Sequence, residues 1–131
     1  MAKKTEDLDQ ELFFRALADR TRLRLINLMG NDEVCVCFFV DALKTNQPKI
    51  SRHLAYLRRA GIVEARREGT WMHYRVATPK DPDAAQVLAD IRAWLTKDAN
   101  MKQERKFLAQ LCCLPASPVT ISSPRKRTST K

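Results

Sequence analysis

The sequence lacks long apolar runs: none approaches the roughly 18 residues that a membrane-spanning helix requires. Its first residues, Met-Ala-Lys-Lys-Thr-Glu-Asp, are too polar for a secretory signal. Glycine is scarce, at 3 residues, and the sequence shows no Gly-rich phosphate-binding loop and no pairing of a nucleophile with a base. We therefore expect a cytoplasmic protein with no membrane partner, no enzymatic activity and no organic cofactor.

Acidic residues are scarce relative to basic ones. The chain has 15 Asp and Glu against 24 Lys and Arg, which gives a formal net charge of +9. Part of this excess lies near the end of the sequence, where no acid follows Ser117 and the basic residues are Arg125, Lys126, Arg127 and Lys131. Such an excess of positive charge suits a polyanionic partner such as nucleic acid.

The first third of the chain has the periodicity of short helices. Apolar residues at helical spacing predict a helix over 8–17, and Asp19 is a suitable N-cap for a second one, which ends at Gly30. A third, shorter helix carries Phe38, Phe39 and Leu43. The sequence therefore predicts three consecutive helices before residue 45.

A fourth helix starts at the turn that contains Pro48 and ends near Gly61. Its apolar residues Ile50, Leu54 and Leu57 fall at i, i+4 and i+7, so one stripe of the helix is expected to be buried. Two strands, over 62–67 and 71–76, follow it as a hairpin whose turn includes Gly69. A long amphipathic helix from about 84 to 96 and a further helix over 101–111 complete the predicted elements.

These elements together predict a mainly α (α+β) fold, a winged helix-turn-helix with a C-terminal dimerisation helix. We expect a DNA-binding and dimerisation domain over 1–98 and a helical extension over 99–114. Residues 115–131 are rich in Ser, Thr and Pro and are expected to form a disordered basic tail.

Basic and hydrogen-bonding side chains lie off the apolar stripe of the 48–60 helix, where they form a face suited to the major groove of double-stranded DNA. Gln and Arg can read purine edges, whereas Ser, Lys and Tyr more often hold phosphates. The expected DNA-binding residues are Gln47, Lys49, Ser51, Arg52, His53 and Tyr56 on the helix and Arg66, Arg67, His73 and Arg75 on the hairpin. The alternative is a solvated basic face without a partner.

The four cysteines form two close pairs, Cys35 with Cys37 and Cys112 with Cys113. In a reducing compartment this spacing favours metal or redox chemistry over a structural disulfide. Residues i and i+2 lie about 200° apart around a helix, so Cys35 and Cys37 can face one ion only if Cys35 precedes the helix or binding distorts its first turn. The alternative is that both are small buried apolar side chains.

The only histidines, His53 and His73, are not next to a cysteine in the sequence and fall within the expected DNA surface. Neither is therefore expected to bind a metal. The long helix near 84–96 contains no histidine, and its apolar face is expected to pack against its symmetry mate and the first helix.

Four stretches of this sequence, spanning about residues 12–76, resemble the ArsR/SmtB metalloregulators, and within them the arsenic-responsive repressors. The stretches are Phe14-Arg15-Ala16-Leu17-Ala18-Asp19 with Thr21-Arg22-Leu23, then Glu33-Val34-Cys35-Val36-Cys37, then Gln47-Pro48-Lys49-Ile50-Ser51-Arg52-His53-Leu54 with Leu57-Arg58, and finally Gly69-Thr70-Trp71-Met72-His73-Tyr74-Arg75. The resemblance implies a homodimeric repressor that binds operator DNA and is released by a metal or metalloid, with As(III) or Sb(III) as inducer.

The sequence departs from the family pattern at two positions. Where the arsenic repressors have a third cysteine, three residues after the second, this chain has Val40, and the acidic residue that often follows the cysteine pair is replaced by Phe38. The three-thiol site of the family therefore does not transfer intact. We expect Cys112 or Cys113 to complete the site, although the two could also form a second, separate thiol site.

Other signals for the same cysteines remain open. An organoarsenical needs only two thiols and would account for Val40. Cadmium or lead could bind the same thiolates, and oxidants could convert them to sulfenate or disulfide. A constitutive architectural DNA binder, insensitive to any thiophile, is a further alternative.

Overall fold

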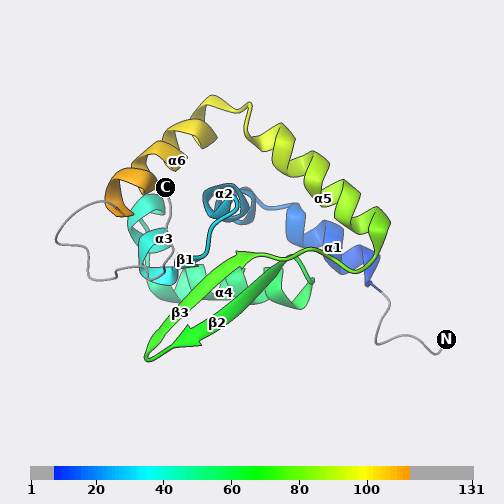
Figure 1. The fold of residues 1–131 in the computed structure, drawn as a ribbon, viewed down its shortest axis with the longest axis horizontal. Coiled ribbons are helices and arrows are strands. Elements are labelled where there is room, and N and C mark those ends of the chain that lie inside the picture. Colours follow the sequence, from blue (N-terminus) through cyan, green and yellow to red (C-terminus); the bar gives the residue numbers. More distant parts are fainter. Residues whose placement is uncertain (1–7, 113–131) are drawn as a thin grey trace.

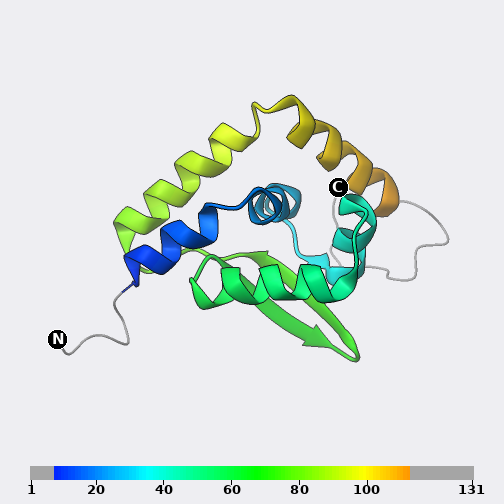
Figure 2. The ribbon, with the colours of Figure 1, turned by 180° about the vertical axis from the view of Figure 1, so that it is seen from behind.

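The computed structural model describes residues 8–112, which form six helices and a small sheet. The elements in chain order are α1 (Gln10–Leu17), α2 (Arg20–Met29), β1 (Val34–Cys35), α3 (Val36–Leu43), α4 (Gln47–Arg59), β2 (Val63–Glu68), β3 (Trp71–Val76), α5 (Pro82–Leu95) and α6 (Ala99–Cys112). In both Figure 1 and Figure 2, α2 lies between two groups of elements. On one side are α4 and the sheet, and on the other are α5 and α6. None of the helices in this described range is long and apolar enough to cross a membrane.

Side-chain caps fix where the helices begin. Asp19 precedes α2 in an extended conformation and accepts a hydrogen bond from the backbone N–H of Arg22, as the sequence predicted. Asn46 does the same for α4 by accepting from the N–H of Lys49, and Pro48 occupies the first turn, where its missing N–H costs little. The predicted start of this helix is therefore confirmed.

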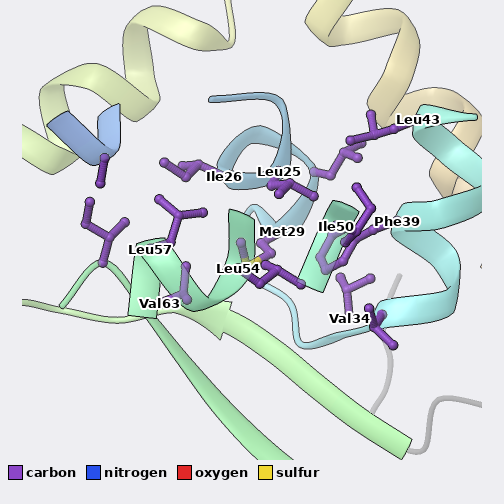
Figure 3. Packing of buried hydrophobic residues seen from close by; sticks show 14 of the residues in the cluster. Leu25, Ile26, Met29, Val34, Phe39, Leu43, Ile50, Leu54, Leu57 and Val63 are labelled. Carbon is purple, nitrogen blue, oxygen red and sulfur yellow. The ribbon is translucent and has the colours of Figure 1, made fainter. Parts of the chain in front are cut away.

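The apolar stripe of α4 forms the centre of the core. Ile50, Leu54 and Leu57 have no exposed surface, and they pack against side chains of α2, α3 and β2 (Figure 3). Burying each of these side chains stabilises the fold by about 1.5–3 kcal/mol relative to leaving it in water. The predicted buried stripe is confirmed, and it fixes which face of α4 points outward.

The sheet has three strands in the order β1-β3-β2, all antiparallel. The hairpin of β2 and β3 turns at Gly69, whose φ of 64° lies in the left-handed region that favours glycine. The sequence predicted this hairpin but not β1, which is only two residues long. With the helices before it, the hairpin completes a winged helix-turn-helix, which confirms the predicted fold class.

The last described helix, α6, packs on α2 and α3. Met101 is fully buried, and the buried amide of Asn27 donates to the Met101 carbonyl at 2.9 Å. Arg105 donates to the Asn27 carbonyl at 2.7 Å, and its guanidinium lies where a side chain on Gly30 would otherwise be. The extension expected over 99–114 is thus helical as far as Cys112, and its contacts reach the thiol-bearing helix α3.

Candidate thiol site and nucleic-acid interface

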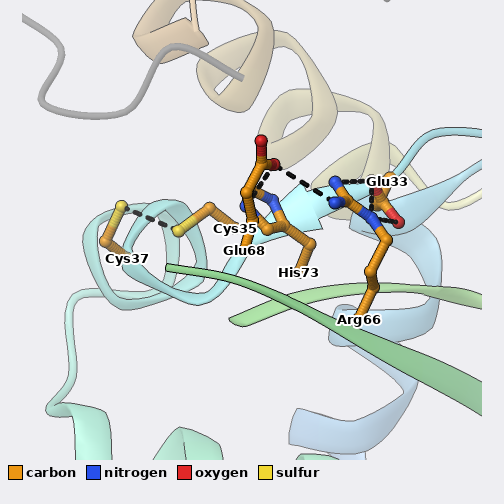
Figure 4. A network of polar contacts seen from close by, with 6 residues as sticks. All are labelled: Glu33, Cys35, Cys37, Arg66, Glu68 and His73. Carbon is orange, nitrogen blue, oxygen red and sulfur yellow. Dashed lines mark hydrogen bonds and ion pairs between the residues drawn. The ribbon is translucent and has the colours of Figure 1, made fainter. Parts of the chain in front are cut away.

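Cys35 and Cys37 lie at the junction of β1 and α3. Cys35 is the residue before α3 and has the extended φ and ψ of a strand (−73° and 143°), whereas Cys37 lies in the first turn of the helix. The change from strand to helix brings the two Sγ atoms to 3.5 Å of each other (Figure 4). Of the two arrangements that the sequence allowed, the structure has the one in which Cys35 precedes the helix.

The separation of the two sulfurs suits a single soft ion. Thiolates bind Zn²⁺ at about 2.3 Å, so two sulfurs at a tetrahedral angle would lie ~3.8 Å apart. The observed 3.5 Å therefore needs little rearrangement for both to reach one ion. Within residues 8–112, no group of three or more His, Cys, Asp and Glu side chains is placed to hold a metal ion.

The two thiols share their protons unequally. A hydrogen bond from Cys37 lowers the pKa of Cys35 to about 7 from its ordinary 9.0, against the opposing effect of burial. The same hydrogen bond, followed by burial, raises the pKa of Cys37. Ionised Cys35 therefore stabilises the fold above pH 9, and this contribution is lost as the pH falls through about 7.

Burial differs between the two cysteines. Cys35 has no exposed surface, and Cys37 is partly exposed. An incoming thiophile would therefore meet Cys37 first and reach Cys35 behind it. Of the second pair, Cys112 is the last residue of α6 and Cys113 lies outside the described residues, so the geometry of that pair is not defined.

A polar network borders the thiol pair. Arg66 of β2 donates three hydrogen bonds to Glu33, the shortest at 2.6 Å, and also pairs with Glu68 at 3.2 Å (Figure 4). Hydrogen bonding from Arg66 is the main reason that the pKa of Glu33 is lowered. His73 is 3% exposed; its Nε2 lies 3.8 Å from Glu68, and its buried Nδ1 has no hydrogen-bond partner among residues 8–112.

The outward face of α4 carries the polar residues that the sequence assigned to the DNA groove. Gln47, Lys49 and Arg52 are exposed, and Ser51 is partly exposed. The hairpin adds the exposed Arg67 and Arg75, of which Arg75 pairs with Glu64 at 2.9 Å. The structure therefore brings these basic side chains onto one helix and one adjacent hairpin.

His53 and Tyr56 make contacts inside the molecule. The guanidinium of Arg22 lies 3.3 Å from His53 Nδ1 and 4.1 Å above the Tyr56 ring. It also donates to the carbonyls of Ala16 and Arg15 at the end of α1, at 2.8 and 3.0 Å. These two residues of α4 therefore join α4 to α1 and α2, a role that periodicity alone did not indicate.

Two further residues expected on the DNA surface are engaged within the molecule: Arg66, although exposed, is paired, and His73 is buried. Arg66 is held by Glu33 and Glu68, as described above. His73 lies on the buried face of β3, directly opposite Cys35 across the β1–β3 pair. Neither histidine is next to a cysteine in the sequence, but the short strand β1, which has no periodicity to reveal it, brings His73 beside Cys35 in the fold.

Replacing Cys37 with Ala should raise the pKa of Cys35 above about 7, because the thiol that donates to its sulfur is lost. Cys37→Ser keeps a hydroxyl donor and should shift it less. The measurement is the ultraviolet thiolate absorbance as a function of pH, with Cys35→Ala subtracted as reference. An unchanged midpoint in Cys37→Ala would contradict the assigned proton sharing.

Comparisons with known proteins agree with this geometry. Residues 19–65, from the N-cap of α2 into β2, match the family described as "Bacterial regulatory protein, arsR family". The chain is 42% identical over 119 residues to the arsenic resistance transcriptional regulator ArsR1 of Pseudomonas putida, covering 87% of this chain and 88% of that protein. It is 39% identical over 101 residues to the arsenical resistance operon repressor of Escherichia coli, covering 76% and 85%.

Solved structures show the same architecture. The homodimeric winged helix-turn-helix DNA-binding domain from Mycobacterium bovis is 32% identical, with a TM-score of 0.57 over 76% of this chain and 94% of that one. HlyU from Vibrio cholerae, at 23% identity, shares the fold with the same TM-score over 72% and 97%. With two relatives near 40% identity over most of their length, this chain belongs to the arsR family of bacterial regulatory proteins, a family of DNA-binding transcriptional regulators and not of enzymes.

Proposed function

We propose that this chain is a homodimeric repressor that binds operator DNA and is released when Cys35 and Cys37 bind trivalent arsenic or antimony. The observation that carries the proposal is the 3.5 Å contact between the two sulfurs at the start of α3, the element directly before α4, whose exposed face we assign to DNA. The names of the two relatives, an arsenic resistance regulator and an arsenical resistance operon repressor, support the nature of the inducer.

Soft trivalent ions prefer thiolate over oxygen ligands. Cys35 and Cys37 supply two sulfurs, and we propose that Cys112 or Cys113, from the same subunit or its partner, supplies the third. The packing of α6 on α3 supports this assignment, because it brings the helix that ends at Cys112 against the helix that carries Cys37. On this basis we treat 1–98 as the DNA-binding and dimerisation domain, and 99–114 as an extension that contributes to the sensor site.

The proposed DNA-binding surface is the exposed face of α4 together with part of the wing, which is the hairpin of β2 and β3. We assign the groove contacts to Gln47, Lys49, Ser51 and Arg52, and backbone contacts to Arg67 and Arg75, on the basis of their exposure. His53, Tyr56, Arg66 and His73 instead hold the reading elements in place, since each contacts other parts of the molecule or is buried. Phosphate contacts of this kind release counterions, so binding should weaken steeply with salt.

The dimer would use the exposed apolar side chains of α1 and α5. Phe14 on α1 is 54% exposed and Trp94 on α5 is 73% exposed, which is unusual for such large apolar groups. The homodimeric relative from Mycobacterium bovis supports a two-fold assembly. A dimer must place its two recognition helices about 34–36 Å apart to enter successive major grooves.

A second candidate signal is an organoarsenical. Only two thiols, Cys35 and Cys37, meet within residues 8–112, and Val40 stands where a third would be expected. An arsenical that keeps one carbon substituent needs only two sulfurs. The same protein with Cys112 and Cys113 both changed to Ser would then still respond to phenylarsine oxide.

Cys35→Ser and Cys37→Ser should each bind operator DNA as the parent does, but arsenite should no longer release them. Coupling between inducer and DNA is typically about 5- to 150-fold in affinity, so the loss is measurable by fluorescence anisotropy of labelled operator. Cys112→Ser and Cys113→Ser, measured alongside, identify the third ligand. If arsenite released Cys35→Ser or Cys37→Ser from operator DNA at the same arsenite concentration that releases the parent, the proposed site would be disproved.

Arg52→Ala should weaken operator binding, by about 1–3 kcal/mol and with relaxed sequence preference if the side chain reads a base. If it holds a phosphate instead, the slope of log affinity against log salt should fall by about 1. The matched control is Arg15→Ala, which removes an exposed arginine from α1, outside the proposed surface. Equal effects of the two changes, or none from Arg52→Ala, would argue against α4 as the reading helix.

Trp94→Glu should convert the dimer to a folded monomer, because it puts a charge into the apolar contact while the side chain packs little against its own subunit. Sedimentation velocity measures the dimer, and circular dichroism checks the fold. Trp71→Glu, a similar change at the exposed start of β3, should leave the dimer intact. Retention of the parent's dimer affinity in Trp94→Glu would exclude this face of α5.

A further inference from the structure

Cys35 belongs to a row of residues that crosses the whole sheet. The register places Cys35 of β1 opposite His73 of β3, and His73 opposite Arg66 of β2. Side chains at directly opposite positions of neighbouring strands point to the same face and lie close together. The candidate thiol site and the wing are therefore parts of one sheet, and a change in the backbone at Cys35 acts directly on β3.

A polar bridge spans the same three strands. Glu33, two residues before Cys35, accepts hydrogen bonds from Arg66 Nε at 3.0 and 3.1 Å and from its terminal nitrogen at 2.6 Å (Figure 4). Arg66 also reaches Glu68 at the tip of the wing. One guanidinium thus joins the segment that leads into the thiol site to the end of the wing hairpin.

The geometry of this bridge is more specific than that of an ordinary surface ion pair. Both carboxylate oxygens of Glu33 take part, in the planar two-point arrangement that arginine makes with a carboxylate. The Glu33 side chain is 29% exposed, so water competes for it only partly. Surface ion pairs contribute little to stability, but a two-point pair fixes the relative position of the groups it joins.

We propose that Glu33 and Arg66 are positioning residues that transmit occupancy of the Cys35–Cys37 site to the wing. The two sulfurs already lie close enough for one ion, so the movement comes from adding the third ligand, which draws the ion and Cys35 toward it and displaces β1, and with it Glu33. Arg66 then shifts or is released, and the wing presents a different surface to DNA. The inference rests on the proposed function and gives it a physical connection, through the sheet, between the thiol site and the hairpin of β2 and β3.

The wing contains a matched pair for comparison. Glu64 and Arg75 join β2 and β3 at 2.9 Å, with both side chains exposed. The charge of Arg75 contributes to the lowered pKa of Glu33, but Arg66 alone donates hydrogen bonds to Glu33 within the described residues. Removing the Glu64 carboxylate therefore disturbs a carboxylate–arginine pair of the same hairpin while the hydrogen bonds between Arg66 and Glu33 stay in place. A coupling effect that is specific to Glu33 must be absent from Glu64.

The experiment compares full-length Glu33→Gln and Glu64→Gln with the parent. Operator affinity is measured by anisotropy with and without arsenite, and arsenite affinity is measured in the absence of DNA. We expect the operator affinity of Glu33→Gln without arsenite, and its arsenite affinity without DNA, to stay within about twofold of the parent. The ratio of its operator affinity without arsenite to that with arsenite should fall at least fivefold. Glu64→Gln should keep the parent's ratio. Because linkage is reciprocal, operator DNA should also weaken arsenite binding less in Glu33→Gln.

Arg66→Gln removes the other partner of the same pair. It therefore shows whether an effect of Glu33→Gln comes from loss of the pair or from an unrelated change at residue 33. It should lose coupling to the same extent, and the double variant with Glu33→Gln should lose no more. An unchanged ratio in Glu33→Gln, or an equal fall in Glu64→Gln, would overturn the proposal. So would an Arg66→Gln protein that binds operator weakly but responds fully to arsenite, since Arg66 would then be a DNA contact. If the parent itself is not released by arsenite, the proposed function fails before any variant is compared.

Discussion

The pairing of β1 with β3 is the constraint on which the candidate site depends. Two residues of extended chain, Val34 and Cys35, pair with Tyr74 and His73, and the helix α3 begins immediately after them. In a continuous helix, two cysteines separated by one residue would face nearly opposite sides. Because Cys35 is held in a strand and Cys37 in a first helical turn, their sulfurs meet at 3.5 Å. The strand therefore creates the pair and at the same time connects it to the wing.

The sequence predicted the elements that have periodicity. The stripe of Ile50, Leu54 and Leu57, the cap at Asp19 and the turn at Gly69 all occur as expected, because each depends on local spacing or local backbone geometry. A strand of two residues has no periodicity, so β1 could not be recognised in this way. The neighbours that β1 brings together, Cys35 and His73, are 38 positions apart in the chain and were missed for the same reason.

The candidate DNA surface shows a similar division. Composition and spacing identified α4 and the hairpin as the candidate surface. They could not distinguish side chains that point into solvent from side chains that contact a neighbouring helix. His53 and Tyr56 lie off the apolar stripe, and yet Arg22 draws both toward α2. Arg22 itself lies near the start of another helix, 31 positions before His53, and a partner at that distance is visible only once the chain is folded. Polarity alone therefore does not show which of these side chains also hold the helices together.

The packing also limits how the proposed signal can act. Unpacking α4 would expose Ile50, Leu54 and Leu57, at a cost of about 1.5–3 kcal/mol each, whereas an inducer typically couples to DNA by about 1–3 kcal/mol in total. Binding at the thiols therefore cannot pull α4 out of its own core. Arg22 ties α4 to the ends of α1 and α2, so these three helices must move as one body. The response is then restricted to a rotation of that body relative to the partner subunit and to a displacement of the wing, the element joined to the thiol site by Glu33 and Arg66.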